Sequence, residues 1–375
     1  MAKSFVKWPG GKTDELSIIY KYMPDHINNY IEPFLGGGAC FLSLRPEQYN
    51  CAYINDYSNE LISLYMMIKN RNELFVNCLY DIWHLWNYTG ILAEENYEII
   101  RQIYSLFKND EISYKDLTIK IDKLIDKKRI EIEVEVRNNI NIITDDLIKE
   151  IKKSLKSKLR TIKNNEMKKQ DLPEEDYHKN FEAGFKAGVY TFYRKIYNKR
   201  DKLNISHELH IALFFYLREF CYSSMFRYNK SGEFNVPYGG ASYNSKGFIT
   251  KINYFWSQEL QDVLQEANIY NLDFEEFFRK LTIEEDDFVF LDPPYDTTFS
   301  KYANNDFTSE DQVRLANYLI NECKGKFMMI IKNTDFIYNL YNREGINIIG
   351  FDKKYKVSFQ DRNDKQVEHI IIKNY

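Results

Sequence analysis

Short apolar runs, each followed within two residues by an acidic, amide or glycine residue, recur near both ends of the chain. They are residues 30–34 and 51–54 near the start, and 267–272, 288–291 and 327–331 in the last third. Runs of this length bounded by turn residues are typical of buried strands. Apolar residues at helical spacing follow several of them, as after Ser58, which we expect to be an N-cap. This alternation of strands and helices predicts a parallel α/β sheet.

The end of the chain has a different pattern. Residues 354–359 and 367–372 are two further strand-like runs, and they bracket the polar stretch 360–364. Two strands joined by such a short polar segment are typical of a hairpin. We therefore expect an antiparallel hairpin to close the sheet.

The middle of the chain changes in character. Residues 88–190 are dense in Lys, Glu, Asp and Ile at helical spacing, which predicts a charged helical insertion. Its basic run, 149–169, is either a solvated helix face or a surface that follows DNA phosphates. An apolar helix expected at 211–220 then leads to a stretch in which aromatic residues, Arg, Asn and Gly surround a turn at 230–232. That stretch predicts a projecting hairpin.

These patterns divide the chain into two domains. Residues 1–60 and 250–375 carry the strand and helix alternation of the α/β domain. Residues 61–249 carry the helices and the hairpin, with the charged insertion at about 90–190. A chain of 375 residues is long enough for this arrangement.

Composition narrows the class of protein. The five cysteines are scattered without a Cys-x-x-Cys pair, so we expect neither a disulfide framework nor a metal site. The sequence has no apolar segment of membrane-spanning length, and we expect a cytoplasmic protein without membrane contact. The net charge of -4 means that a nucleic-acid partner has to be held by a local basic face. Abundant Ile, Lys, Asn and Tyr point to an AT-rich bacterial or phage genome.

The first candidate for chemistry is the tetrapeptide Asp292-Pro293-Pro294-Tyr295, which follows the apolar run 288–291. Ligands gather at the carboxyl ends of parallel strands. The prolines lack N–H donors, so the ladder ends here and the Pro293 carbonyl is left to face a pocket. An amine between that carbonyl and the Asp292 carboxylate would have an acceptor for each proton, and Tyr295 offers its face to a ring. The alternative is that the prolines only end a strand while the aspartate caps the next turn.

The second candidate lies at the end of the first strand, where Glu32 is followed by Gly36, Gly37 and Gly38. Glycines let a ligand lie against the backbone, although such a loop can also be a simple turn. Asp56 follows the next strand, at a place where a carboxylate can bind two ribose hydroxyls. The sequence has no Gly-Lys-Ser/Thr signature for nucleotide phosphates, so an adenosyl ligand without phosphates fits better. This points to S-adenosylmethionine.

Four motifs in one order resemble the Dam-type family of DNA adenine-N6 methyltransferases (D12 class, alpha group). They are Lys7-Trp8-Pro9-Gly10-Gly11-Lys12, residues 32–38, Arg227-Tyr228-Asn229 with residues 232–237, and Asp292-Pro293-Pro294-Tyr295. The resemblance covers most of the chain outside the insertion. It implies a Rossmann-like class I methyltransferase sheet with a C-terminal antiparallel hairpin. The α/β domain would be the S-adenosylmethionine-binding catalytic domain, and residues 61–249 the DNA target-recognition domain.

The resemblance also implies the site residues of the catalytic domain. Asp292, Pro293, Pro294 and Tyr295 would form the catalytic loop, in which two acceptors hold the adenine N6 amine and Tyr295 stacks on the flipped base. No metal is required. The residues implied to line the cofactor pocket are Trp8, Lys12, Glu32, Phe34, Gly36, Gly37, Gly38, Asp56, Asp273, Phe274 and Asp292. Trp8 has the alternative of an ordinary half-buried aromatic, and Asp56 that of a charge at a helix N-terminus.

Contacts to double-stranded DNA are implied for the hairpin and for one lysine near the N-terminus. The residues are Lys7, Tyr222, Ser223, Met225, Arg227, Tyr228, Asn229, Asn235 and Pro237. Arg227 would bind guanine O6 and N7, which is worth about 1–3 kcal/mol of discrimination. Its alternative is a pair with a phosphate or with Glu233.

The sequence departs from the family pattern at three places. Ser223 stands where an Asn is familiar, Lys332-Asn333 stands where Ser-Asn is familiar, and residues 361–365 replace an Asn-Gly and basic pattern. The first and last leave the recognition site open between GATC and a related short sequence.

We therefore expect a site-specific enzyme that moves a methyl group from S-adenosylmethionine to adenine N6 in duplex DNA. It would act in marking DNA or as the protective half of a restriction-modification pair. The alternatives are a catalytically silent DNA-binding relative, or a methyltransferase acting on RNA adenine or protein glutamine. The intact catalytic and glycine loops favour activity, and the hairpin favours DNA. The sequence leaves the oligomeric state open.

Overall fold

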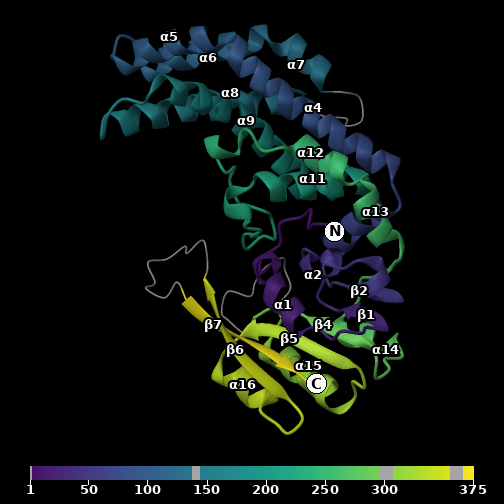
Figure 1. Ribbon diagram of the computed structural model, residues 1–375. Helices are drawn as coiled ribbons and strands as arrows, with labels where there is room; N and C mark the ends of the chain where they lie inside the picture. Colours follow the sequence, from purple (N-terminus) through teal and green to yellow (C-terminus); the bar gives the residue numbers. More distant parts are fainter. Residues whose placement is uncertain (1, 137–143, 296–306, 355–365) are drawn as a thin grey trace. The chain divides into compact units, whose positions relative to one another are not determined.

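The computed structural model describes residues 2–136, 144–295, 307–354 and 366–375. It contains two compact units (Figure 1). The first unit is Met1–Asn70 together with Tyr254–Tyr375, and the second is Arg71–Asn253. The predicted boundary at 60/61 falls inside the helix α3 (Asn59–Lys69), whereas the first unit includes this whole helix. Ser58 caps this helix, as expected, by accepting a hydrogen bond from the backbone of Leu61.

The first unit is built on a seven-stranded sheet with the order β3-β2-β1-β4-β5-β7-β6. All pairs from β3 to β5 are parallel, and β7 runs antiparallel to both of its neighbours. The mixed α/β fold and its antiparallel C-terminal hairpin are as predicted. The strands are β1 Asn29–Glu32, β2 Cys51–Asn55, β3 Ala267–Tyr270, β4 Phe288–Leu291, β5 Lys326–Lys332, β6 Asn347–Lys354 and β7 Gln366–Lys373.

The first strand of the hairpin begins earlier than the sequence pattern predicted. Strand β6 is described from Asn347 to Lys354, and the rest of the predicted run, 355–359, lies outside the described residues. Its early part pairs with Ile370–Ile372 of β7, so these apolar residues on both strands define the register. Residues 355–365, which include the unusual stretch 361–365, lie outside the described residues.

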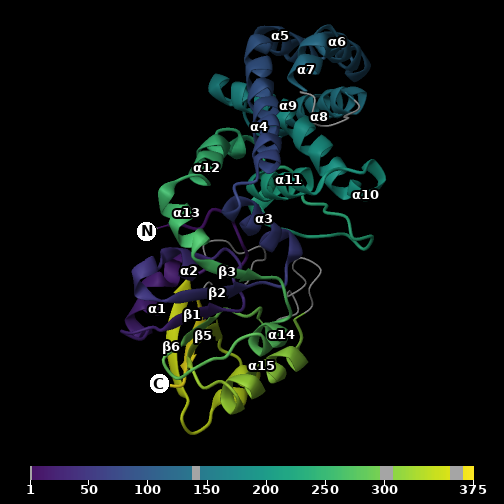
Figure 2. The same ribbon diagram turned by 90° about the vertical axis from the view of Figure 1, so that its right-hand side faces the viewer.

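Both faces of the sheet are covered by helices (Figure 2). On one face, α14, α15 and α16 bury Phe277, Leu315 and Ile337 against strand residues such as Val289. On the other face, Phe41 of α2 stacks on Tyr30 with ring centroids 6.3 Å apart. The helices of this unit are α1 Leu16–Tyr22, α2 Ala39–Ser43, α3, α13 Gln258–Gln265, α14 Phe274–Arg279, α15 Ser309–Asn321 and α16 Asp335–Tyr341, with 3-10 turns at Thr13–Glu15 and Pro46–Gln48. Burial on both faces explains why the parallel strands are continuous apolar runs.

The second unit is helical and carries the hairpin. Its helices are α4 Glu73–Glu95, α5 Tyr97–Lys108, α6 Tyr114–Lys127, α7 Arg129–Glu135, α8 Thr144–Glu166, α9 Glu174–Asn198, α10 Arg200–Leu203, α11 His207–Phe220 and α12 Phe248–Tyr254, with 3-10 turns at Tyr222–Ser224 and Ala241–Tyr243. The bounds predicted for the insertion, 90 and 190, fall inside α4 and α9. Gly184 and Gly188 of α9 lie against Leu155 and Ile151 of α8, where a Cβ would meet backbone atoms. These two glycines allow α8 and α9 to pack closely.

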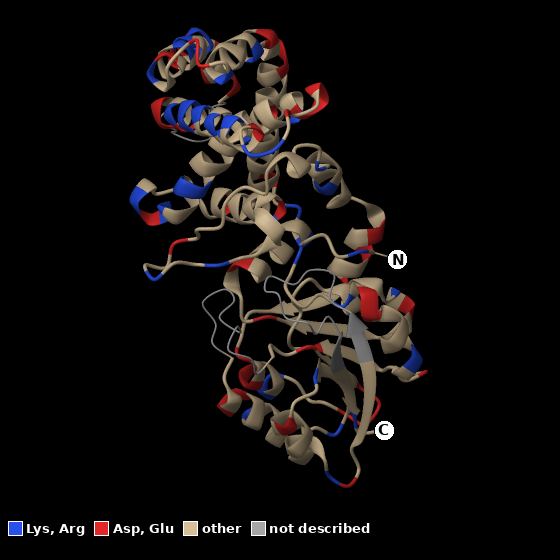
Figure 3. Ribbon diagram, turned by 90° about the vertical axis from the view of Figure 1, so that its left-hand side faces the viewer, with Lys and Arg blue, Asp and Glu red and all other residues tan. Residues whose placement is uncertain are grey.

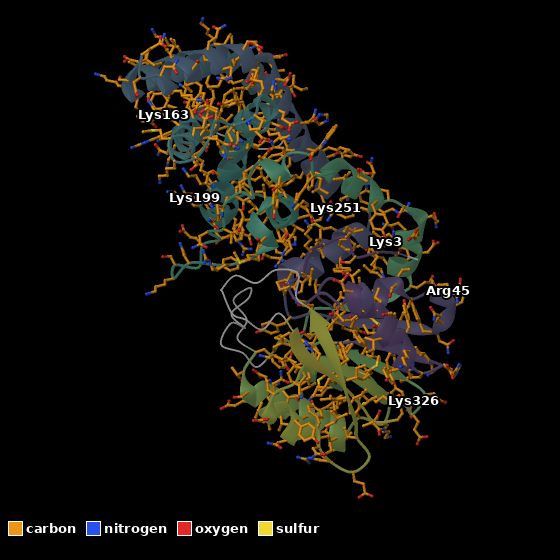
Figure 4. All side chains as sticks on the ribbon, turned by 60° about the vertical axis from the view of Figure 1, so that its left-hand side comes forward. Lys3, Arg45, Lys163, Lys199, Lys251 and Lys326 are labelled. Carbon is orange, nitrogen blue, oxygen red and sulfur yellow. The ribbon has the colours of Figure 1, made fainter. Side chains whose placement is uncertain are left out.

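Part of the basic run of α8 is paired within this unit. Lys152 and Lys156 form ion pairs with Asp126 and Asp122 of α6, with N–O distances of 2.6 and 2.7 Å. Lys163, labelled in Figure 4, is buried and donates to the carbonyl of Phe107 at 2.6 Å. Figure 3 shows Lys and Arg in a row along one of these helices, with Asp and Glu on other helices of the unit. Lys152, Lys156 and Lys163 therefore join α8 to its neighbours, while the use of the other cations of the run is a matter for experiment.

Candidate functional site

The candidate site follows from the strand order. The order reverses between β1 and β4, which are parallel neighbours, and the chain leaves this point toward opposite edges of the sheet. Ligands of open α/β sheets bind outside the carboxyl ends of the strands at such a reversal. The segments that follow β1 and β4 are the predicted glycine loop, 32–38, and the predicted catalytic loop, 292–295. Both therefore begin at the same place in the sheet.

The glycine loop is tightly packed, so a side chain in place of two of its glycines would clash with neighbouring atoms. Gly36 and Gly38 have φ of 51° and 63°, which strongly favours glycine. A Cβ on Gly36 would lie 2.9 Å from Cδ1 of Trp8, and one on Gly38 would overlap the hydroxyl of Tyr65. Asp56 fixes the loop from the next strand, because its two carboxylate oxygens accept from the backbone of Gly36 at 2.9 Å and of Ser58 at 2.8 Å.

Replacing Gly38 by alanine is expected to destabilise the protein by about 1–3 kcal/mol through the left-handed backbone alone. The overlap with the Tyr65 hydroxyl should add to this cost. The matched control is Gly345→Ala, because Gly345 has a φ of 81° and a Cβ added there would have no atom within 4 Å. Urea unfolding should show a larger loss for Gly38→Ala, and adding Tyr65→Phe should restore part of the difference. Equal losses for the two glycines would show that the hydroxyl is not an obstacle.

Glu32 lies at the end of β1, at the start of the glycine loop. Its side chain is buried and accepts a hydrogen bond of 2.8 Å from the hydroxyl of Tyr30. Burial raises the pKa of Glu32 well above its usual range, and the nearby charges of Asp292 and Asp56 act in the same direction, while the Tyr30 hydroxyl opposes them. Glu32 is thus a fixed acceptor in a site that disfavours its charge.

Two aromatic residues predicted for the cofactor pocket lie together. The rings of Phe34 and Phe274 are 5.7 Å apart, and Phe34 also meets Phe307 edge-on at 5.5 Å. Asp273 caps α14 by accepting from the backbone of Glu275 at 3.0 Å. Arg314 of α15 donates to Asp273 at 2.8 Å, and its guanidinium lies 4.8 Å from the centre of the Phe274 ring.

Sequence patterns did not identify Phe307 or Arg314, and they also missed Asn55. The Asn55 side chain is buried and donates to the carbonyls of Pro33 and Leu272 at 3.1 and 3.0 Å. It also accepts from the backbone of Leu272 at 2.9 Å. Asn55 therefore ties the loop after β1 to the loop after β3. The signal in the sequence that could have identified Asn55 was its position as a polar residue at the end of an apolar strand.

The predicted catalytic loop is held by Lys12. This lysine is 2% exposed, and its ammonium donates to the Asp292 carboxylate, to the carbonyl of Gly10 at 2.8 Å and to the hydroxyl of Tyr295 at 3.4 Å. The lysine predicted for the cofactor pocket thus contacts two residues of the catalytic loop. Pro293 is buried, while Pro294 is exposed and its carbonyl accepts from Gln312 at 2.8 Å.

The predicted hairpin is present in the second unit. Tyr228 and Phe234 pair across it, and the backbone of Asn229 donates to the carbonyl of Glu233 at 2.8 Å. The Asn229 side chain accepts from the backbone of Ser231 and of Glu233, both at 2.9 Å, and Gly232 has a φ of 75°. Asn229 therefore shapes the turn itself.

The remaining hairpin residues differ in what they present to solvent. Arg227 is exposed, and its Nε donates to Asn235 at 3.3 Å. The hydroxyl of Tyr228 is hydrogen-bonded to the hydroxyl of Tyr197, with the two oxygens 3.0 Å apart. Ser223 has a φ of 53°, a conformation that Asn adopts more readily than Ser. Tyr222, Asn235 and Pro237 are exposed, Met225 is half-buried, and Lys7 is exposed on the first unit.

Among the described residues, no helix is both long and apolar enough to cross a membrane. No group of three or more His, Cys, Asp or Glu side chains among them could hold a metal ion.

Comparison with known proteins confirms the resemblance that the motifs indicated. A family model described as D12 class N6 adenine-specific DNA methyltransferase matches residues 8–130 and 132–357. The Type II methyltransferase M.CviBI of Paramecium bursaria Chlorella virus NC1A is 27% identical over 379 residues, which cover 100% of both chains. The Type II methyltransferase M.MjaIII of Methanocaldococcus jannaschii is 25% identical over 388 residues, covering 100% of this chain and 99% of the relative.

A DNA adenine methylase of Haemophilus influenzae is 24% identical over 354 residues, covering 91% of this chain and 83% of the relative. The family match extends over both units of the structure. The protein is therefore an adenine-specific DNA methyltransferase that belongs to the D12 class.

Proposed function

We propose that the protein transfers a methyl group from S-adenosylmethionine to N6 of an adenine that is flipped out of duplex DNA at a short specific site. The observation that carries the proposal is the meeting of the glycine loop and the Asp292 loop at the reversal point of the sheet. One loop suits an adenosyl ligand, and the other suits an amino group. The methyl donor and the acceptor would thus lie side by side.

The glycine loop suits the cofactor for two reasons. Its glycines have no Cβ atoms, so a ligand can lie against the backbone. The neighbouring side chains are hydrogen-bond acceptors and aromatic rings. Glu32 and Asp56 would accept from hydroxyl groups, since a carboxylate has about four lone-pair sites and two on Asp56 are taken by the backbone. Trp8, Phe34 and Phe274 would line the pocket with flat apolar surface. S-adenosylmethionine would supply the methyl group as an electrophile.

The catalytic loop would act on the adenine amine through hydrogen bonds. Asp292 and the carbonyl of Pro293 would each accept a hydrogen bond from one N–H of the amine. These two bonds favour a pyramidal nitrogen whose lone pair is less conjugated with the ring. Tyr295 would stack on the base and recover part of the few kcal/mol that flipping costs. Lys12 already donates to Asp292, so the amine would share the carboxylate with this ammonium.

The hairpin would recognise the site. Arg227 is an exposed residue of the hairpin, and its guanidinium would be suited to bind guanine O6 and N7. Lys7 would add a base or phosphate contact. The site would be GATC or a related short sequence. Because two relatives are named Type II methyltransferases, a role beside a restriction enzyme is one form of this proposal.

Replacing Arg227 by alanine is expected to lower discrimination at one base pair by about 1–2 kcal/mol, or roughly 5- to 30-fold. The matched control is Lys230→Ala, because Lys230 is an exposed cation at the tip of the same hairpin. That change should weaken binding to all sequences alike. Competition between cognate and singly altered duplexes at fixed salt measures both. A uniform loss for Arg227→Ala would instead make it a phosphate contact.

The proposal as a whole is tested by incubating the protein with unmethylated genomic DNA and S-adenosylmethionine, followed by modification-sensitive sequencing. We expect N6-methyladenine in one short sequence context. Binding to DNA without methylation would indicate a silent relative. Methylation of RNA or of a protein glutamine under the same conditions, with DNA unmodified, would assign the activity to another substrate.

A further inference from the structure

A buried histidine outside every motif contacts the catalytic loop. His369 lies on β7, between Lys332 of β5 and Phe351 of β6 in the register of the sheet. It is 0% exposed and directly precedes the apolar run Ile370–Ile372. A polar side chain buried in this way has to be satisfied by hydrogen bonds. Its place in the core therefore calls for a partner.

One partner is the hydroxyl of Tyr295. The His369 Nε2 atom lies 3.2 Å from this oxygen, and the two rings meet at 66° with centroids 5.5 Å apart. The ring of Phe351 lies 5.9 Å from the imidazole. From another direction, the ammonium of Lys12 lies 3.4 Å from the same hydroxyl oxygen. The Tyr295 hydroxyl is thus held between two polar side chains.

The chemistry of these groups gives the hydrogen bonds a direction. An ammonium can only donate, so the Tyr295 oxygen accepts from Lys12 and keeps its own proton to donate. A neutral imidazole accepts at one nitrogen and carries its proton on the other. We assign the histidine proton to Nδ1, so that the Tyr295 hydroxyl donates to Nε2 of His369.

We propose that His369 is a positioning residue that fixes the plane of the Tyr295 ring before the flipped adenine arrives. This inference rests on the proposed function of Tyr295 as the stacking surface. A side chain that is already held in place loses less freedom when a base stacks on it. His369 would act only through the Tyr295 hydroxyl, so its effect on methyl transfer should disappear when that hydroxyl is absent.

The first test is a double-mutant cycle on the single-turnover rate of methyl transfer, with cofactor affinity measured in parallel. His369→Phe and Tyr295→Phe should each lower the rate about two- to tenfold, the value of one neutral hydrogen bond. The double variant should be no slower than Tyr295→Phe. His369→Gln, which keeps a polar atom near the Nε2 position, should recover part of the rate. Cofactor affinity should stay unchanged.

Two controls separate this effect from damage to the core. Tyr341→Phe removes another buried hydroxyl of the same unit, one without a hydrogen-bond partner among the described residues, and should leave the rate unchanged. His210→Phe changes a buried histidine of the second unit. It should not show the dependence on Tyr295. Additive losses in the cycle, or a wild-type rate for His369→Phe, would overturn the proposal.

The second test needs no activity and so separates this inference from the proposed function. Nitrogen-15 NMR of the histidine rings should show His369 protonated at Nδ1, and Tyr295→Phe should shift the Nε2 resonance. The opposite tautomer, or a resonance that ignores Tyr295, would overturn the proposal even if the enzyme is active. Should the wild type fail to methylate DNA while these signals appear, the hydrogen bond stands and the proposed function fails.

Discussion

Replacing Asp292 by alanine is expected to lower the single-turnover rate of adenine methylation by about 100- to 1,000-fold, the usual loss when one preorganised transition-state contact is removed. The change deletes one of the two acceptors for the amino group. Asp292→Asn keeps the shape and one acceptor oxygen, so its rate should lie between those of alanine and the wild type. Quenched-flow measurement with a radioactive methyl donor and excess enzyme gives these rates.

The same change also leaves Lys12 without its carboxylate. Since this ammonium is 2% exposed, unfolding has to be measured with the rate. Asp335→Ala is the matched control, because Asp335 is an exposed carboxylate at the start of α16 in the same unit. Asp335→Ala should change neither the methylation rate nor the free energy of unfolding by much. A folded Asp292→Ala protein that methylates DNA as fast as the wild type would contradict the assignment of this residue.

Local patterns predicted the parts of the fold that short segments determine. The apolar runs gave β1 to β5 to within a few residues, because strands buried on both faces need continuous apolar sequence. Ser58 and the turn at Gly232 were predicted because capping and positive φ depend on one residue type. The start of β6 was missed because only two apolar residues, Ile348 and Ile349, lie between Asn347 and Gly350, and the strand gains its register from pairing with β7.

Contacts between distant residues were beyond such patterns. Lys12 and Asp292 are 280 positions apart, and only the folded sheet brings them together. Arg314 and His369 lie in ordinary helical and strand sequence, so their link to Asp273 and Tyr295 has no local sign. The basic run of α8 shows the same limit, since its charges are visible in the sequence but the pairing of Lys152 with Asp126 is not.

Replacing Glu32 by glutamine is expected to have opposite effects on cofactor binding and on stability. Glutamine keeps one acceptor oxygen and replaces the other by an NH2 group, so one hydrogen bond from the cofactor is lost. At about 0.5–1.5 kcal/mol this loss should weaken S-adenosylmethionine binding roughly 2- to 10-fold. Equilibrium dialysis measures this affinity without DNA. Glu47→Gln, at an exposed position of the same unit, should leave the affinity unchanged.

The effect on stability follows from the direction in which burial moves the pKa of Glu32, which is upward. A carboxyl group with a raised folded pKa binds its proton more tightly in the folded state, so the wild type loses stability as pH rises from about 4.3 toward that folded pKa. The Glu32→Gln variant does not lose stability in this way, because glutamine has no carboxyl proton to release. Across that interval, urea unfolding at a series of pH values should therefore shift in favour of Glu32→Gln. If cofactor affinity falls while this pH-dependent gain is absent, Glu32 binds the cofactor but is not held in a site that disfavours its charge. If the gain appears with unchanged affinity, the buried carboxylate is part of the core of the sheet, and the cofactor is held by other residues of the glycine loop.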